Sequence, residues 1–390
     1  MFENAEECSR GGVTGRRSLV WVLGLCLMAG WPHGVLASDK PDEAIGKIRE
    51  RCKVVLDKAL GNENAFVRSA AARAAGESGD PALVGFLNKA GKDVYYNVRL
   101  FALQGLKNIS IEDTVLLAEK LMQDSNVWVK AQAIEYLGDL AGEGYRETLR
   151  TYLKDPDPPV RFAAAAALVK IGETDKLKVL LDALDHPDVT FQYHAIAYLG
   201  KIGTDEVYPH LVHLLEKPED EIRFYGLKAI GDKVKLDLLP QLQALVKSPN
   251  PSLRHQAALE LGYLPSHFTR DLLRELCQDP DGMVRIAAAV ALKRFGQKHC
   301  DGVFENALKD ADYGIRSTAA RVLGEVKLED RPRLLRMASD DPNTRVRTST
   351  ARAIGMMGGA EAFPLLLRLL SDSNEAIRAY AAGNLLKLTR

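Results

Sequence analysis

The sequence predicts an all-α superhelix, a solenoid of about eleven helical hairpins stacked side by side. A pair made of a hydrophobic residue and a basic or polar residue recurs every 31 residues, eleven times from Val67-Arg68 to Ile377-Arg378, without an insertion. A small residue follows three positions after each pair, and leucine, isoleucine or alanine follows seven positions after it. Because offsets −1, +3, +4 and +7 share one face of an α-helix, each pair marks a helix with a buried face.

All offsets are counted from the second residue of each pair. These residues are Arg68, Arg99, Lys130, Arg161, Gln192, Arg223, Arg254, Arg285, Arg316, Arg347 and Arg378. A leucine-rich stretch at about +18 to +23, such as Leu180 to Leu184, predicts a second helix in each unit. Neither helix can bury its apolar face alone, whereas stacked neighbours can.

The helix boundaries follow the same period. Asparagine or aspartate at offset −4 predicts N-caps, whose side chains accept the free N–H groups of the first turn. These residues are Asn64, Asn126, Asp157, Asp188, Asn250, Asp281, Asp312, Asn343 and Asn374, and Tyr95 and Glu219 interrupt the column. Glycine at offset +8 is interpreted as the helix stop signal. These glycines are Gly76, Gly138, Gly200, Gly231, Gly262, Gly324 and Gly355.

Residues 1–37 have the three parts of an export signal peptide. Arg16 and Arg17 precede an apolar run from Leu19 to Ala29, and Val35-Leu36-Ala37 is a small-residue cleavage site. We therefore expect a periplasmic or secreted protein whose solenoid domain spans 38–390, with no membrane attachment after cleavage. An uncleaved membrane anchor, a lipoprotein signal at Cys26 and a twin-arginine export route remain open alternatives.

Charge and cysteine content narrow the possible partners. The chain has 52 basic and 52 acidic residues, so no general electrostatic attraction toward nucleic acid or an anionic membrane is expected. After cleavage three widely spaced cysteines remain, namely Cys52, Cys277 and Cys300. This odd number predicts no disulfide framework and a domain stabilised by its core alone.

The repeat unit resembles a known family. Asp155-Pro156-Asp157, followed by Val160-Arg161 and alanines, resembles the HEAT repeat, and the 31-residue period resembles the short subtype of phycobilin lyases. The resemblance covers about 350 residues and implies a hydrogen-bonded ladder between turn acids and helix arginines. Asp155 with Arg161, and Asp279 with Arg285, match that pattern.

Motifs for catalysis are missing from the sequence. Deoxyhypusine hydroxylase is a di-iron HEAT-type enzyme with paired His-Glu motifs, and none of the eight histidines here precedes a glutamate. His210 and His213, three residues apart, are interpreted as surface residues. There is no Gly-Xaa-Ser-Xaa-Gly elbow or phosphate loop. We therefore expect no cofactor, no metal site and no enzymatic activity.

The inner wall of the solenoid is the predicted binding surface, at offsets +1, +2, +5 and +6. Aromatic residues and a histidine gather there in the middle repeats: Phe101, Tyr136, Phe162, Tyr193, His194, Tyr198, Phe224 and Tyr225. They form either an exposed recognition stripe or a set of rings buried by tight curvature. Arg321 and Arg352, both at offset +5, are a second candidate, for an anionic ligand, unless they are simply solvated.

The predicted function is an exported scaffold that binds a partner protein or peptide on its concave surface. One alternative is a lyase-like chromophore handler or an accessory factor of a redox complex. Another alternative is a membrane-tethered assembly factor, which an uncleaved leader would favour.

The leader generates a direct prediction. N-terminal sequencing of the exported protein should begin Ser38-Asp39-Lys40, because signal peptidase cuts after small residues such as Ala37. An intact Met1 or a lipid on Cys26 would contradict this cleavage.

Overall fold

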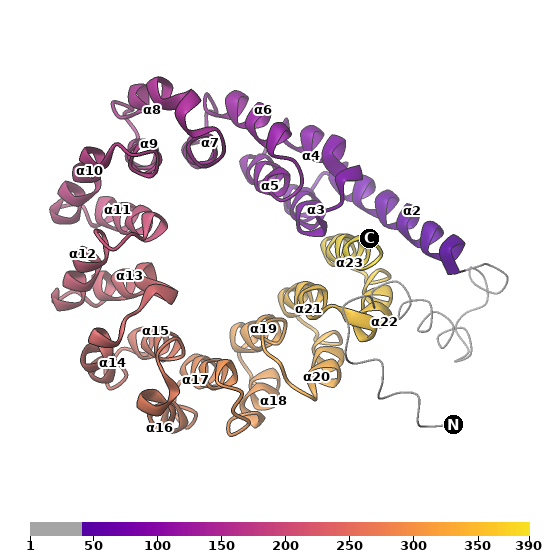
Figure 1. The fold of residues 1–390 in the computed structure, drawn as a ribbon. Coiled ribbons are helices and arrows are strands. Elements are labelled where there is room, and N and C mark those ends of the chain that lie inside the picture. Colours follow the sequence, from indigo (N-terminus) through magenta and orange to yellow (C-terminus); the bar gives the residue numbers. More distant parts are fainter. Residues whose placement is uncertain (1–40) are drawn as a thin grey trace.

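The computed structural model describes residues 41–390, which form eleven helical hairpins joined into a ring (Figure 1). These residues contain helices and no strand, so the all-α solenoid is confirmed. The predicted leader and its cleavage site lie outside the described residues. Within 41–390, none of the helices combines the length and the apolar character needed to span a bilayer.

The ring has two layers. Helices that carry the recurring pair form the inner layer, and leucine-rich helices form the outer layer. The inner helices are α3 (Ala65–Ser78), α5 (Tyr96–Lys107), α7 (Val127–Ala141), α9 (Pro158–Lys170), α11 (Val189–Ile202), α13 (Asp220–Ile230), α15 (Pro251–Leu261), α17 (Gly282–Arg294), α19 (Tyr313–Val322), α21 (Thr344–Met357) and α23 (Glu375–Leu388).

Most of the outer helices are shorter than the inner ones, and the first, α2, is the longest of the described helices. They are α2 (Pro41–Leu60), α4 (Val84–Ala90), α6 (Ile111–Leu121), α8 (Arg146–Tyr152), α10 (Leu177–Asp182), α12 (Tyr208–His213), α14 (Leu239–Leu245), α16 (Ser266–Leu276), α18 (Gly302–Leu308), α20 (Arg331–Ala338) and α22 (Gly359–Leu369). Single 3-10 turns extend or connect them: η2 (Pro81–Leu83), η3 (Gly142–Tyr145), η4 (Thr174–Lys176), η5 (Ala183–Asp185), η6 (Leu214–Glu216), η7 (Gly231–Lys233) and η8 (Leu236–Leu238).

The predicted N-caps begin the inner helices as expected. Asn64, for example, accepts a hydrogen bond from the backbone N–H of Phe66 at 2.9 Å. Asp157 occupies the cap position without such a bond, because Pro159 at the second helical position has no N–H to donate. Tyr95 and Glu219, which interrupt the column, also make no side-chain cap bond.

The interpretation of the +8 glycines as stop signals is wrong for most of them. Gly76, Gly138 and Gly200 lie inside their helices, which end several residues later at Gly79, Gly142 and Gly203. A Cβ on Gly76 would stand 2.3 Å from the Cα of Gly105 in the next inner helix. These glycines therefore permit close backbone approach. Gly231, at φ +51°, and Gly262 do cap their helices as predicted.

The close approaches alternate along the ring. At every second junction the +8 glycine meets a small residue at offset +6 of the next inner helix. These pairs are Gly76 with Gly105, Gly138 with Ala167, Gly200 with Ala229, Gly262 with Ala291 and Gly324 with Ala353. The junctions between them carry larger +6 residues, namely Tyr136, Tyr198, Glu260, Val322 and Asn384. The contacts with small residues thus recur every 62 residues, and Gly355 additionally approaches Asn384 at one of the intervening junctions.

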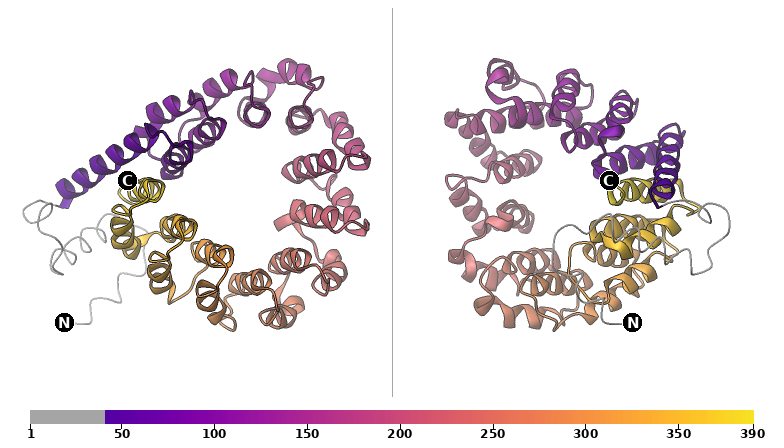
Figure 2. Two further views of the ribbon diagram at one scale, coloured as in Figure 1. Left: turned by 180° about the vertical axis from the view of Figure 1, so that it is seen from behind. Right: turned by 45° about the vertical axis from the view of Figure 1, so that its right-hand side comes forward.

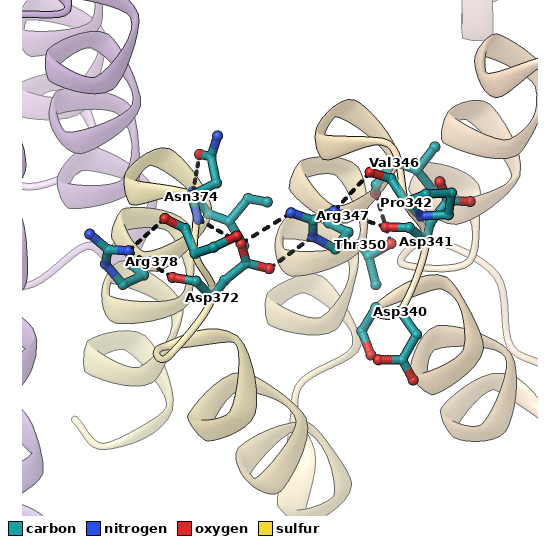
Figure 3. Close-up of polar contacts among 12 residues, drawn as sticks. Asp340, Asp341, Pro342, Val346, Arg347, Thr350, Asp372, Asn374 and Arg378 are labelled. Carbon is teal, nitrogen blue, oxygen red and sulfur yellow. Dashed lines mark hydrogen bonds and ion pairs between the residues drawn. The ribbon is translucent and has the colours of Figure 1, made fainter.

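The ladder implied by the family resemblance forms, with a different pairing of its side chains (Figure 3). Arg347 donates to both carboxylate oxygens of Asp372, which lies 25 residues later in the next turn. Its Nη1 donates to the backbone oxygens of Asp341 and Pro342. The same cross-turn ion pair joins Arg68 to Asp93, Arg99 to Asp124, Lys130 to Asp155, Arg254 to Asp279 and Arg316 to Asp341. Arg161 and Arg285 thus bond the backbone, rather than the carboxylates, of Asp155 and Asp279.

A disulfide joins Cys277 to Cys300, so the expectation of a domain without disulfides is wrong. Cys277 follows α16 and Cys300 precedes α18, and the fold brings these two outer helices together although 23 residues separate the cysteines. No ion pair joins Arg285 to Asp310 at this junction of the described ring, although Asp310 stands at the ladder position. The covalent link therefore joins neighbouring repeats where the ladder does not. Cys52 is free and buried.

The solenoid closes on itself, because α23 packs against α3 (Figures 1 and 2). A Cβ on Gly383 would lie 2.4 Å from the backbone oxygen of Ala74, so the two helices touch through their backbones. Three groups of polar contacts accompany this seam. Arg352 donates to Glu77 at 2.6 Å, Arg49 donates to the backbone oxygen of Leu386 at 3.2 Å, and Asn62 donates to Glu375.

Adding one methyl group at the seam distinguishes a closed ring from an open solenoid. Gly383→Ala should lower the free energy of unfolding by about 1–3 kcal/mol, because the new Cβ overlaps the backbone of Ala74. In an open solenoid the same change would raise stability by up to about 1 kcal/mol, through helix propensity alone.

Gly85→Ala is the matched control, since Gly85 is also helical and a Cβ there meets nothing within 4 Å. Urea denaturation of the three proteins measures the difference. If both variants were stabilised alike, the ring would be open in solution.

Candidate functional site

The inner wall is partly covered by sharp bending of the ring at α9. The rings of Trp128 on α7 and His194 on α11 lie 5.0 Å apart, and Lys201 on α11 pairs with Glu135 on α7 at 2.5 Å. These contacts join two helices that are not neighbours and cover α9 between them. Phe162 on α9 is consequently only 2% exposed.

Two members of the predicted aromatic stripe therefore belong to the core. Phe162 and Tyr198, at 2% and 7% exposure, are buried, and burial also raises the pKa of the Tyr198 hydroxyl. The expectation of a continuous exposed stripe is wrong at these two positions, because curvature brings the neighbouring inner helices over them. The remaining rings are half-buried, and they fall into separate groups.

An open cavity of about 560 Å³ lies between the inner helices α11 and α13, on the side of the ring opposite the seam (Figure 1). We call it the α11–α13 cavity. It brings together the predicted residues Tyr193, His194 and Tyr225. Its other walls are Ile196, Ala197, Gly200, Lys201, Lys228, Ala229, Ile230, Gly231, Asp232 and Lys233. This volume lies within the range of small-ligand and side-chain binding pockets.

Two tyrosine rings form one end of the cavity. Tyr193 and Tyr225 lie with ring centroids 4.3 Å apart, and Phe224 packs edge-on against Tyr225. The Tyr193 hydroxyl donates to Glu221 at 2.9 Å, and desolvation together with this carboxylate raises the pKa of Tyr193 to about 12. Burial lowers the pKa of His194, so its imidazole is neutral at pH 7. The aromatic end thus offers uncharged rings whose positions neighbouring contacts hold.

Lysines form the other end, where α11 and α13 terminate. Lys233 donates to the backbone oxygen of Gly200 at 3.0 Å and lies against Gly203, which has φ +58°. A Cβ on Gly203 would collide with the Lys233 ammonium group. Glycine at this helix end therefore satisfies the left-handed backbone conformation and also makes room for a lysine of the next repeat.

The remaining predicted residues lie apart from the α11–α13 cavity. The Arg73 guanidinium lies over the Phe101 ring at 5.2 Å, and the Lys107 ammonium lies over the Tyr136 ring at 4.1 Å. The two predicted anion-binding arginines already have carboxylate partners. Exposed Arg321 bonds Glu325 within its own helix at 3.1 Å, and Arg352 bonds Glu77 across the seam.

Sequence reasoning missed the basic side of the cavity. Lys228 occupies offset +5, the same column that singled out Arg321, so the signal was present beside Phe224 and Tyr225. Lys233 follows the end of its helix and belongs to no column, so no periodic pattern identifies it. The contacts between α7 and α11 could not be predicted without knowing the curvature of the ring.

Comparison with known proteins agrees with this architecture. The family model described as HEAT repeats matches residues 114–192, 147–231, 238–302 and 300–387, which together exceed half of the chain. The chain belongs to the HEAT-repeat family. The match identifies the HEAT repeat and not the phycobilin-lyase subtype, which stays a prediction. No curated protein matches this HEAT-repeat chain in sequence.

Solved structures similar to this HEAT-repeat chain include human deoxyhypusine hydroxylase in complex with glycerol, at 19% identity and a TM-score of 0.30, covering 65% of this chain and 98% of that one. An engineered protein is 18% identical, with a TM-score of 0.31, covering 88% of this chain and 99% of that one. A Kap121p mutant is 13% identical, with a TM-score of 0.40, covering 88% of this chain and 47% of that one. Superposition this weak carries no functional argument.

The histidine pair considered as a metal site lies on the outer layer. His210 and His213 are both on α12, and His213 bonds Glu216 at 2.8 Å. Among residues 41–390, no three or more His, Cys, Asp or Glu side chains come together in a group that could hold a metal ion.

A buried carboxylic acid lies at the junction next to the cavity. Glu260 on α15 is 2% exposed, accepts a hydrogen bond from Gln256 at 2.6 Å and leaves its Oε2 without a partner. Burial raises the pKa of Glu260 to about 7, which Gln256 and Arg294 partly oppose and Asp232 reinforces. Asp232 also lines the α11–α13 cavity, so the two sites are electrostatically linked.

Glu260→Gln should make the protein's stability less dependent on pH. A folded-state pKa of about 7, against 4.5 for the free side chain, means that stability is lost as pH rises from about 4.5 to 7. Relative to wild type, the glutamine variant should therefore gain up to about 3 kcal/mol between pH 4.5 and 8. Urea denaturation at both pH values measures the change. A difference in unfolding free energy that does not vary with pH would mean that Glu260 titrates normally.

Proposed function

We propose that this HEAT-repeat protein is an exported scaffold that binds a segment of a partner protein in the α11–α13 cavity. The observation that carries the proposal is the cavity itself, where paired tyrosine rings and lysines face the inside of a closed ring. Aromatic side chains lose little conformational entropy on binding, so they are effective anchors in protein interfaces.

Export is supported by two independent features. The first 37 residues have the composition of a signal peptide. The Cys277–Cys300 disulfide suits an oxidising compartment such as the periplasm or the extracellular space, because structural disulfides are rare in the reducing cytosol.

The proposed role is binding without catalysis and without a cofactor. The polar groups of the cavity are lysine ammonium groups, tyrosine hydroxyls, a neutral imidazole and one aspartate. The pKa of the Tyr193 hydroxyl is raised to about 12, the opposite of what an activated nucleophile requires, and Lys233 donates to a backbone oxygen. A pigment that copurifies with the protein would instead favour the lyase-like alternative.

Site-specific photo-crosslinking in the native exported fraction tests the proposal. A photoreactive amino acid at position 225 should crosslink one partner, whereas the same group at position 268 should not. Phe268 is an exposed aromatic residue of the outer helix α16, 45% accessible, and is therefore the matched control.

Tyr193→Ala combined with Tyr225→Ala should reduce capture of that partner at least about tenfold, with little change in Tm. Equal crosslinking at positions 225 and 268, or undiminished capture by the double variant, would place the binding surface elsewhere.

A further inference from the structure

We infer that the α11–α13 cavity recognises an acidic segment of the partner, an extended stretch of chain in which carboxylates accompany an apolar side chain. This inference rests on the proposed function and adds the chemical character of the segment. Its basis is the unequal pairing of charges around the cavity.

Two cavity lysines have no carboxylate partner among residues 41–390. Lys228 makes a cation–π contact with Phe224 at 6.0 Å, and Lys233 bonds only the backbone oxygen of Gly200. By contrast, Lys201 is already paired with Glu135. Ligand carboxylates would supply the partners that Lys228 and Lys233 lack, through charge-assisted hydrogen bonds.

Within residues 41–390, none of the acids near the cavity forms an ion pair with these two lysines. Glu221 accepts the hydroxyl of Tyr193, and Glu135 pairs with Lys201 across α9. Asp232 lies near enough to Glu260 to raise the pKa of that residue. The cavity therefore presents the positive charges of Lys228 and Lys233, with free hydrogen-bonding capacity, against one carboxylate in its wall, that of Asp232.

The apolar surface of the cavity adds a second requirement. Ala197 and Ala229 supply its accessible apolar surface, whereas Ile196 and Ile230 in the same wall are buried, each 1% exposed. A purely charged ligand would leave this surface in contact with water, whereas an aliphatic or aromatic side chain would cover it. An acidic segment with an apolar residue next to its carboxylates satisfies both parts of the wall.

The position of the lysines favours a segment over a folded domain. Lys201 lies in the last turn of α11, and Lys233 lies just beyond the end of α13, so the basic end of the cavity lies at an edge of the ring. The seam at α3 and α23 is closed by backbone contact. An extended segment reaches the cavity from the edge without opening that seam.

Fluorescence anisotropy with three labelled peptides tests the inference on the full-length mature protein. Each peptide has about twelve residues, with leucine and either glutamate, glutamine or lysine separated by glycine and serine. The glutamate peptide should bind at least about tenfold more tightly than the lysine peptide, and added salt should weaken it. Equal or tighter binding of the lysine peptide, or no binding of the glutamate peptide by about 1 mM, overturns the inference.

Charge reversal locates the interaction. Lys228→Glu should weaken binding of the glutamate peptide about tenfold, and adding Lys233→Glu should weaken it further. Lys89→Glu combined with Lys247→Glu is the matched control, because both lysines are exposed in the outer layer, and it should leave the Kd unchanged. Lys228 makes no hydrogen bond to any residue of 41–390, so its single variant is not expected to disturb folding. Wild-type affinity in that variant would contradict the inference.

The partner found by crosslinking separates this inference from the proposed function. If the tyrosine double variant loses the partner while Lys228→Glu retains it with full affinity, the cavity is the binding site and the acidic specificity is wrong. If neither variant changes capture, the proposed function fails as well.

Discussion

Direct backbone contact between inner helices at alternate junctions is the constraint on which the ring depends. Gly138 faces Ala167, and Gly262 faces Ala291, at distances where any larger residue would push the helices apart. The intervening junctions carry Tyr136, Tyr198 or Glu260 at the equivalent place. The α11–α13 cavity lies at one of the close junctions, where Gly200 faces Ala229, so close approach of two inner helices does not by itself cover the inner wall.

Stabilising contacts are also distributed unevenly along the ring. Ladder ion pairs join the turns on both sides of the seam, whereas in the arc from α9 to α15 the ladder positions hold His186, Gln192 and Ser248 instead of acid or base. In that arc the neighbouring helices are joined by aromatic contacts and by single pairs such as Lys235 with Asp205. The proposed binding cavity lies within it. The arc from α9 to α15 is therefore joined by fewer charged links between turns than the flanks of the seam are.

Local features of the fold were predictable from sequence because each depends on a few neighbouring residues. The 31-residue period predicted the hairpins, and Asn64 and Asp281 predicted helix starts that form with the expected hydrogen bonds. Features that depend on accumulated geometry were not predictable. Closure through Gly383 and Ala74 sums the small rotations of eleven repeats, and the Cys277–Cys300 pair becomes visible only when two outer helices are adjacent. The glycines at offset +8 were recognised in the sequence. Their role in helix packing could be assigned only from the structure, where Gly200, for example, faces Ala229 of the next inner helix.

The candidate site illustrates the same division between local pattern and curvature. Their positions in the 31-residue repeat predicted that four residues lie on the inner wall, and the helices do direct these side chains inward. They are Phe162, Tyr193, His194 and Tyr225. Curvature then separated them, because α7 and α11 cover Phe162 on α9 whereas α11 and α13 leave Tyr193 and Tyr225 at an open cavity. A solenoid with uniform spacing would present every repeat alike. In this ring the contacts between α7 and α11 instead cover Phe162 and leave Tyr193 and Tyr225 at a cavity, so the residues that set the curvature matter for the proposed binding as much as the residues that would touch a ligand.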